Sequence, residues 1–424
     1  MAYLHNDSIL RGSGIIRSAK GESKVIEIGK LSIENDCNRV RVSSFVSVDG
    51  GVFPLWFSVP VKYKKYISDN CADAFVVTLL NLAMREGWDI HSQTPITKSL
   101  YFKLTKNLLP TLCANSPRFH CPKILAETIP DVRESFGAVG TGISCGVDSL
   151  HVLALYGHEC KDDDMRVTHL VCNNVWPSGS AGGKRHQDQL AFVRKFADVF
   201  GYELIDVDTN LYEDFFQNHL FAHTYVNLGA ILVLNGFWGK YYYASSGLGP
   251  KNSLNISNIE YRDCSYYDLF LCSNLSPVGA HFFSLGADVD RFSKMKILAE
   301  FPPAWKWLNV CGDVLGKNCG RCGKCCRVLT MLDALGDEKL YRFRESFDIE
   351  YYLKKRHWYM RWAIINGVLG REVLGDSWKA FVSRVSMKDW MIILLSFPYW
   401  CMRPIIRRNL AKVLFLRKIY KKYF

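Results

Sequence analysis

The sequence predicts an α/β fold in which a parallel sheet has helices on both faces, preceded by an α+β region and followed by a cysteine-rich knuckle and a helical C-terminus. Strand-like and helix-like segments alternate through 138–300, which is typical of βαβ units. The stretch GTGISCGVDSLHVLALYG at 140–157 places small and polar residues between a strand and a helix, and five cysteines gather between residues 311 and 326. We therefore expect four regions, 1–135, 138–300, 301–336 and 337–424.

Composition and charge narrow the classes of function. The chain has 424 residues, enough for several domains, and a net charge of +12. Eight cations and no acid lie in 403–424, so the rest of the chain carries only 12 − 8 = +4 and shows no nucleic-acid footprint. The start of the chain lacks a signal-peptide pattern, no apolar run reaches about 18 residues, and the cysteine count is odd. We expect a cytoplasmic protein whose partner is not nucleic acid.

The N-terminal region shows patterns of both strands and helices. Strands are expected over 24–34, 39–48 and 51–63, where residues alternate or run apolar. Apolar residues at helical spacing predict a helix over 72–87 that ends at Gly87. We interpret this region as the part that selects or delivers the substrate.

Four expected strands alternate with helices in the α/β region. The strands cover 138–144, 167–176, 203–209 and 240–246, and the helices cover 148–157, 185–201 and 215–239, with a Gly/Ser loop at 177–184. Ligands bind in such sheets at the loops that follow the strands. Candidate nucleotide-binding residues are therefore Ser245, Ser246, Asn173 and Asn174 at strand ends, with ordinary polar turns as the alternative.

The loop between the first strand and helix of this region has the residues of a phosphate site. It consists of Ser144, Cys145, Gly146, Val147, Asp148 and Ser149. Backbone N–H groups and a helix N-terminus would meet there, which favours an anion, and the two serines add hydroxyl donors. An acid beside an anion indicates a divalent cation, so the loop favours a nucleoside triphosphate with Mg²⁺. It is not a Walker A loop, and a simple capped helix start is the alternative.

The cysteine cluster has the spacing of a metal knuckle. Cys319, Cys322 and Cys325 are three residues apart, and Cys311 precedes them. Four thiolates make a closed tetrahedral Zn²⁺ site, and an iron–sulfur cluster would use the same ligands. Cys326 competes with Cys325 for the fourth position, and the register favours Cys325.

Both motifs carry a resemblance to a known family. SCGVDS resembles the SGGxDS loop of the PP-loop ATP pyrophosphatases and departs from it at Cys145. CGRCGKC, with Cys311 upstream, resembles the four-cysteine zinc site of 7-cyano-7-deazaguanine synthases, a branch of that family, although the first gap is one residue shorter. The resemblance covers 138–336 and implies a PP-loop fold that binds ATP, Mg²⁺ and structural Zn²⁺. It also implies that Lys294, at the start of a helix, faces phosphate as a catalytic residue together with Asp148.

The leading functional hypothesis is an ATP-dependent ligase. Such an enzyme adenylates a carboxylate or amide oxygen of a small-molecule substrate, releases pyrophosphate, and then releases AMP when a nitrogen nucleophile such as ammonia attacks. One alternative is sulfur transfer in the same fold with Cys145 as the carrier. Another is a nucleotide-binding scaffold without catalysis, which contacts a membrane or nucleic acid through its knuckle and tail.

Two further features of the sequence stay open. His219 and His223 are four residues apart on one expected helix, and His186 follows the Gly/Ser loop. Metal binding or proton transfer is the functional interpretation of these histidines, and ordinary packing is the alternative. The segment 390–402 is apolar but too short to span a bilayer, and 403–424 mixes cations with apolar residues. This tail either contacts an anionic membrane surface peripherally or packs on the body of the protein.

Overall fold

The computed structural model describes residues 25–410 apart from 132–133, 176–182, 216, 247–253, 255, 258, 260–261, 313–314 and 372, and leaves the side chains of 404–410 undescribed. Most of the expected Gly/Ser loop and the end of the basic tail, 411–424, therefore lie outside the described residues. The chain divides into two compact units, 17–310 and 311–424 together with 1–16.

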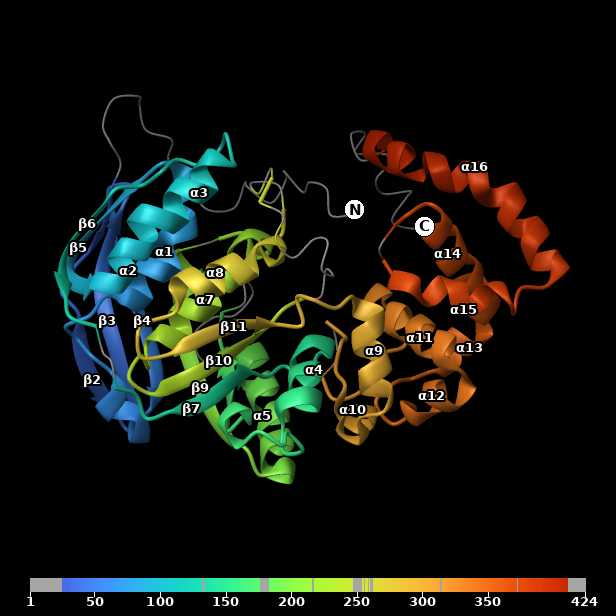
Figure 1. The fold of residues 1–424 in the computed structure, drawn as a ribbon, viewed down its shortest axis with the longest axis horizontal. Helices are drawn as coiled ribbons and strands as arrows, with labels where there is room; N and C mark the ends of the chain where they lie inside the picture. The colour runs from blue at the N-terminus through green and yellow to red at the C-terminus, as the bar shows by residue number, and fades with distance from the viewer. Residues whose placement is uncertain are drawn as a thin grey trace. The chain divides into compact units, whose positions relative to one another are not determined.

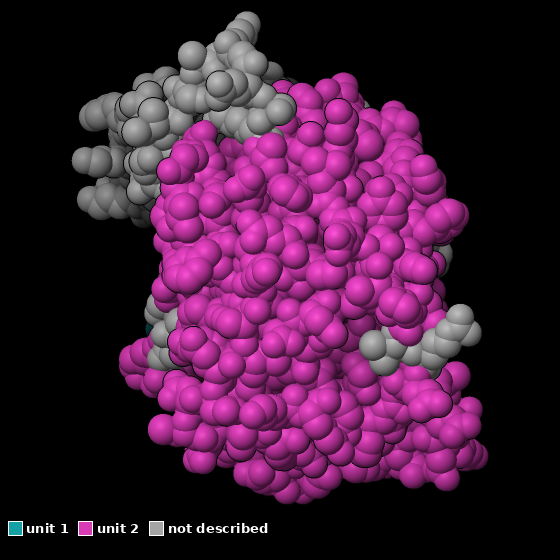
Figure 2. All heavy atoms as spheres, turned by 90° about the vertical axis from the view of Figure 1, so that its left-hand side faces the viewer, with its two compact units in different colours: residues 1–16, 311–424 teal, residues 17–310 magenta. Residues whose placement is uncertain are grey.

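An 11-stranded mixed sheet organises the unit 17–310 (Figure 1). Its order is β11-β10-β7-β8-β9-β4-β3-β1-β5-β6, and β2 pairs with β3. Figure 2 shows residues 17–310 as one continuous body on the side where strands β2 to β6 lie. The strands are β1 (Val25–Ile28), β2 (Ser32–Asp36), β3 (Arg39–Val48), β4 (Gly51–Pro60), β5 (Asp89–Thr97), β6 (Ile124–Ile129), β7 (Ala138–Gly142), β8 (His169–Asn173), β9 (Glu203–Thr209), β10 (Trp238–Ala244) and β11 (His281–Leu285).

The strands β7 to β11 form the parallel half of the sheet, and their alternation with helices confirms the expected α/β fold. Figure 1 shows α4 and α5 on one face of these strands and α7 and α8 on the other. The helices are α4 (Val147–Tyr156), α5 (Lys184–Phe200), α6 (Leu211–Asp214), α7 (His219–Leu232), α8 (Asp268–Leu275), α9 (Arg291–Ala299) and α10 (Pro302–Trp307). Gly140 of β7 has no side chain where the Trp238 ring packs, since a Cβ there would lie 2.3 Å from that ring.

The first six strands continue the same sheet. Strand β4 pairs antiparallel with β9, where Phe57 is opposite Thr209, and one hydrophobic core runs beneath both halves. Helix α1 (Asp73–Glu86) ends at Gly87, which adopts φ +74°, and packs against α7. The remaining helices of this half are α2 (Lys98–Lys103) and α3 (Leu109–Ala114). The regions expected at 1–135 and 138–300 thus share a sheet and a core over their described residues.

The described part of the other unit is helical after its cysteine loop. Its helices are α11 (Gly323–Leu335), α12 (Asp337–Arg342), α13 (Glu350–Lys354), α14 (Arg356–Val368), α15 (Lys379–Val382) and α16 (Met387–Leu410). Asp333 of α11 is fully buried and accepts hydrogen bonds from Tyr352, Arg356 and Arg384. This single carboxylate therefore ties α11 to α13, to α14 and to the segment after α15.

Candidate functional site

The candidate nucleotide site lies at the point where the order of the parallel strands reverses. Strands β7, β8 and β9 follow one another outward in one direction, whereas β10 and β11 lie on the other side of β7. A crevice outside the carboxyl ends of the strands forms at such a reversal, and ligands bind there. The loop 144–149 follows β7, and Ser245 and Ser246 follow β10, so the fold brings these expected site residues to the carboxyl ends of two neighbouring strands at this reversal.

Short-range hydrogen bonds shape the loop 144–149. The Gly146 N–H donates to Ser144 Oγ over 3.2 Å, and Ser149 Oγ donates to the Gly146 carbonyl over 3.2 Å. Among the described residues no side chain caps the N-terminus of α4, whose N-cap is Gly146. The first N–H groups of α4 therefore lack partners from their own helix or from a cap, which is the arrangement that binds an anion.

Asp148, in the first turn of α4, is bound by two cations. Its Oδ1 accepts from Lys294 Nζ over 2.8 Å, and its Oδ2 accepts from Arg291 over 2.9 Å. Burial opposes ionisation of Asp148, but the charges of Arg291 and Lys294 hold the pKa of its carboxyl below the usual range. The structure thus brings together the two expected catalytic residues, Asp148 and Lys294, and adds Arg291.

The same two cations also connect α9 to the end of β10. Lys294, whose side chain is fully buried, donates to the Ser245 carbonyl over 2.5 Å, and Arg291 donates to the Ser246 carbonyl over 2.8 Å. The loop 144–149 and the residues that follow β10 are therefore held around one pair of positive charges. Because both oxygens of Asp148 are occupied, a Mg²⁺ ion bound to this carboxylate would have to displace one of the cations.

Several buried polar atoms near the crevice lack a partner among the described residues. They are Ser246 Oγ, Asn173 Oδ1 and Asn309 Oδ1. Asn309 lies against the loop, since its N–H donates to the Cys145 carbonyl over 2.8 Å. Buried polar groups are almost always hydrogen-bonded, so these atoms fit a polar ligand that supplies the missing partners. With the uncapped α4, they make the crevice chemically compatible with a nucleotide.

Cys145, the departure from the SGGxDS pattern, adopts the left-handed conformation. Its φ is +55°, a region that favours glycine, and its side chain is fully buried. Burial raises the pKa of the thiol well above its usual value, and the nearby Cys172 adds to the effect. The side chain therefore acts as a small buried apolar group.

Asp268 holds a residue of the candidate site through hydrogen bonds. Its carboxylate accepts hydrogen bonds from Ser245 Oγ over 2.7 Å and from Ser284 Oγ over 2.8 Å. Burial raises the pKa of Asp268 to about 6, although both serines oppose the shift. Asp268 thus fixes Ser245, whose hydroxyl points into this network.

The candidate histidines have different surroundings. His186 is buried, and its Nε2 lies 2.8 Å from Asp206, which also pairs with Arg39 of β3. His223 lies between Tyr243 and Asp263, at 2.5 Å and 2.7 Å. The ligand atoms of His223, Asp263 and Cys264 lie within 4.8 Å of one another, so a carboxylate and a thiol join this histidine although the sequence does not reveal them.

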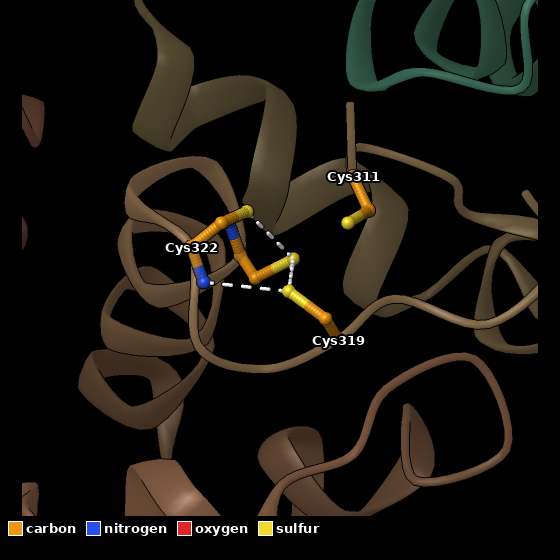
Figure 3. A group of neighbouring side chains, drawn as sticks. Cys311, Cys319 and Cys322 are labelled. Atoms are coloured by element: carbon orange, nitrogen blue, oxygen red, sulfur yellow. Dashed lines mark hydrogen bonds between the residues drawn. The ribbon is translucent and has the colours of Figure 1, made fainter. Parts of the chain in front are cut away.

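The expected metal ligands converge at the start of α11. One ligand atom from each of Cys311, Cys319, Cys322 and Cys325 lies within 4.8 Å of the others. Figure 3 shows the sulfurs of Cys311, Cys319 and Cys322 turned toward a common centre. Cys319 and Cys325 sulfurs are 3.8 Å apart, which is close to the spacing of about 3.8 Å that a tetrahedral Zn²⁺ with bonds of about 2.3 Å requires.

Cys326 has other partners. Its sulfur receives a hydrogen bond of 2.8 Å from the Tyr359 hydroxyl and lies beside the carbonyls of Gly320 and Arg321. Gly320, at φ +65°, allows the tight turn between Cys319 and Cys322, and a Cβ there would lie 1.7 Å from the Asp348 carbonyl oxygen. The structure thus places Cys325 with the other three cysteines, and the set fits a closed Zn²⁺ site.

Three charged residues of the site were absent from the sequence-based expectations. Arg291 lies three positions before Lys294 on the same helix, so its spacing was a usable signal. Asp263 and Asp268 reach the site only through tertiary contacts and carry no local pattern. Comparisons with family models, curated proteins and solved structures gave no match to this chain.

We predict that Cys325→Ser abolishes zinc binding and that Cys326→Ser does not. Purified wild-type protein and Cys326→Ser should contain about one zinc ion per chain, because four thiolates close the site. Elemental analysis of the proteins by mass spectrometry measures this directly. Zinc loss in Cys326→Ser alone would reverse the assignment of the fourth ligand.

We predict that Cys145→Gly leaves stability within about 1 kcal/mol of wild type, because relief of the left-handed strain offsets the loss of a small buried group. Cys145→Val should destabilise by about 2 kcal/mol or more, since a β-branched residue is strained there. Urea unfolding of both variants supplies the comparison. Equal stability of the two variants would argue against the strained geometry.

We predict a pH-dependent difference between wild type and Asp268→Asn. The folded pKa of Asp268 is raised to about 6, so its favourable contribution is present at low pH and is lost as pH rises through 6. From pH 4 to pH 7 the free energy of unfolding of wild type should fall by about 2 kcal/mol relative to the variant. Urea titrations at both pH values test this, and a constant difference would contradict the raised pKa.

Proposed function

We propose that the protein is an ATP pyrophosphatase of the PP-loop type that works as an AMP-forming ligase. The observation that carries the proposal is the cluster of Asp148, Lys294 and Arg291 beside the uncapped N-terminus of α4. This cluster lies at the strand-order reversal, where ligands of such sheets bind. The fold class and the SCGVDS loop agree with the same assignment.

The residues suggest how a triphosphate would be held. The free N–H groups at the start of α4 donate to phosphate oxygens, and Lys294 and Arg291 neutralise charge that develops when the bond between the α and β phosphates breaks. Asn173, at the end of β8, lies where the nucleoside would extend, and its Oδ1 is free to accept a hydrogen bond. A Mg²⁺ ion would supply further charge neutralisation between phosphate oxygens.

The acceptor would meet the polar cluster at the carboxyl end of β10. Tyr243, near the end of that strand, contacts His223 of α7, and Asp263 orients the imidazole. This cluster can hold or move a proton when an oxygen of a small-molecule substrate attacks phosphorus and a nitrogen nucleophile then displaces AMP. The buried, protonated thiol of Cys145 gives no support to the sulfur-transfer alternative, because a sulfur carrier must be accessible as a thiolate.

The cysteine site would have a structural role. All four ligands are thiolates, so a bound Zn²⁺ has no open position for substrate, and it would clamp the loop before α11 to that helix. The N-terminal end of α11 faces the thiolates, since the Cys325 N–H donates to Cys322 Sγ over 3.5 Å, and such an arrangement stabilises negative charge.

We predict that Asp148→Asn weakens binding of ATP by about tenfold or more, because the buried Lys294 and the partly buried Arg291 lose the charge that positions them. Calorimetry with ATP and with its α,β-methylene analogue in Mg²⁺ buffer measures the affinity. Asp198→Asn, an exposed acid on α5, is the matched control and should bind as wild type does.

The chemistry is tested with the same proteins. Wild type incubated with ATP, Mg²⁺, ammonium and a panel of carboxylate and amide acceptors should release AMP and pyrophosphate, whereas Asp148→Asn should not. Release of ADP and phosphate, or equal ATP affinity in wild type and Asp148→Asn, would overturn the proposal. Tight ATP binding without any AMP from an extended panel of carboxylate and amide acceptors would favour the non-catalytic scaffold.

A further inference from the structure

The outer face of α16 is apolar and exposed over its described residues. Six of its exposed apolar side chains recur at helical spacing: Met387 (79% exposed), Met391 (59%), Leu394 (69%), Leu395 (80%), Tyr399 (43%) and Met402 (55%). The stripe extends over about 23 Å at the rise of an α-helix. We call these six residues the α16 stripe. Contiguous exposed apolar surface of this kind marks an interaction site.

The inner face of α16 holds the helix on its own unit. Ile393 and Trp400 are buried, and Asp389 accepts hydrogen bonds from Arg361 and Ser386 over 2.6 Å each. The Trp400 carbonyl accepts from Arg371 over 3.0 Å. Because these contacts fix the rotation of the helix, the apolar stripe is turned away from the helices against which α16 packs.

The positive charge of the sequence that follows Asp389 indicates which partner fits the α16 stripe. No Asp or Glu follows Asp389 in the sequence, whereas eight Lys and Arg residues lie in 403–424. Aromatic side chains accompany the stripe: Tyr399 belongs to it, and the ring of Trp358 of α14, 44% exposed, lies 6.4 Å from that of Trp400 of α16. Apolar residues flanked by aromatic and basic residues are the composition of helices that lie in the interface of an anionic bilayer.

We propose that α16 docks on an anionic phospholipid surface, with the α16 stripe inserted at the acyl boundary. Within the described part of the chain, no helix has the length and hydropathy needed to cross a bilayer, so the contact is peripheral. A second copy of this chain fits less well, because two such ends would bring two clusters of eight positive charges together. The inference is independent of the proposed catalytic function.

The test uses the full chain and large vesicles of phosphatidylcholine with or without phosphatidylserine. Wild type should co-sediment with the anionic vesicles, and raising the salt concentration should weaken the association. The double variant Leu394→Glu, Leu395→Glu should reduce binding by about tenfold or more, because both side chains would carry charge into the acyl boundary.

A matched control separates this effect from general charge. Phe102→Glu with Val199→Glu changes two equally exposed apolar residues elsewhere (64% and 65% exposed) and should bind vesicles nearly as wild type does. Absence of vesicle binding, equal binding to neutral vesicles, or undiminished binding by the α16 double variant would overturn the proposal. A wild-type dimer that the α16 double variant converts to a monomer, without vesicle binding, would assign the stripe to a second copy instead.

Discussion

The candidate site depends on one carboxylate that binds a fully buried lysine and a partly buried arginine. Lys294 has no exposed side-chain surface, and burial of an unpaired ammonium costs several kcal/mol. Asp148 offsets that cost and at the same time orients Arg291, while the carbonyls of Ser245 and Ser246 accept from the same cations. A charge pair in this position does more than stabilise the fold. It keeps two cations facing the α4 N-terminus, where a phosphate would replace solvent.

The mixed sheet supports that arrangement from both sides of β7. Strand β7, which leads into the loop 144–149, is central in the parallel half, and β4 extends this half through β9. Arg39 of β3 pairs with Asp206 of β9, so a polar contact supplements the backbone pairing at the junction. The two edges of the parallel half therefore differ. Strand β9 pairs with the antiparallel strand β4, whereas β11 is the last strand of the sheet and packs against α8. The N-terminal strands thus serve as scaffold for the site.

The local parts of the fold and the site followed from the sequence, and the long-range parts did not. Strand β9 was expected over its exact residues, and α1 and α5 end at Gly87 and Gly201, which both adopt left-handed conformations. The loop 144–149 and the four converging cysteines were visible because their residues are close in sequence. The pairing of β4 with β9 joins residues about 150 apart, and Asp263 reaches His223 from a separate loop. Neither contact produces a periodic pattern in the sequence, because each of the two partners taken alone is an ordinary polar residue or an ordinary strand residue.

Both compact units use buried carboxylates where apolar packing alone would leave helices free to rotate or slide. In the unit 311–424, Asp333 binds two arginines and Asp389 binds Arg361, and these contacts are directional. Apolar contacts hold helices together without fixing their rotation strongly, whereas a bonded ion pair selects one orientation. For α16 the consequence is specific: Asp389 sets the inner face, so the opposite face is defined even though no described residue of the unit covers it. Fixing α16 through a charge leaves its leucines and methionines available on the outside.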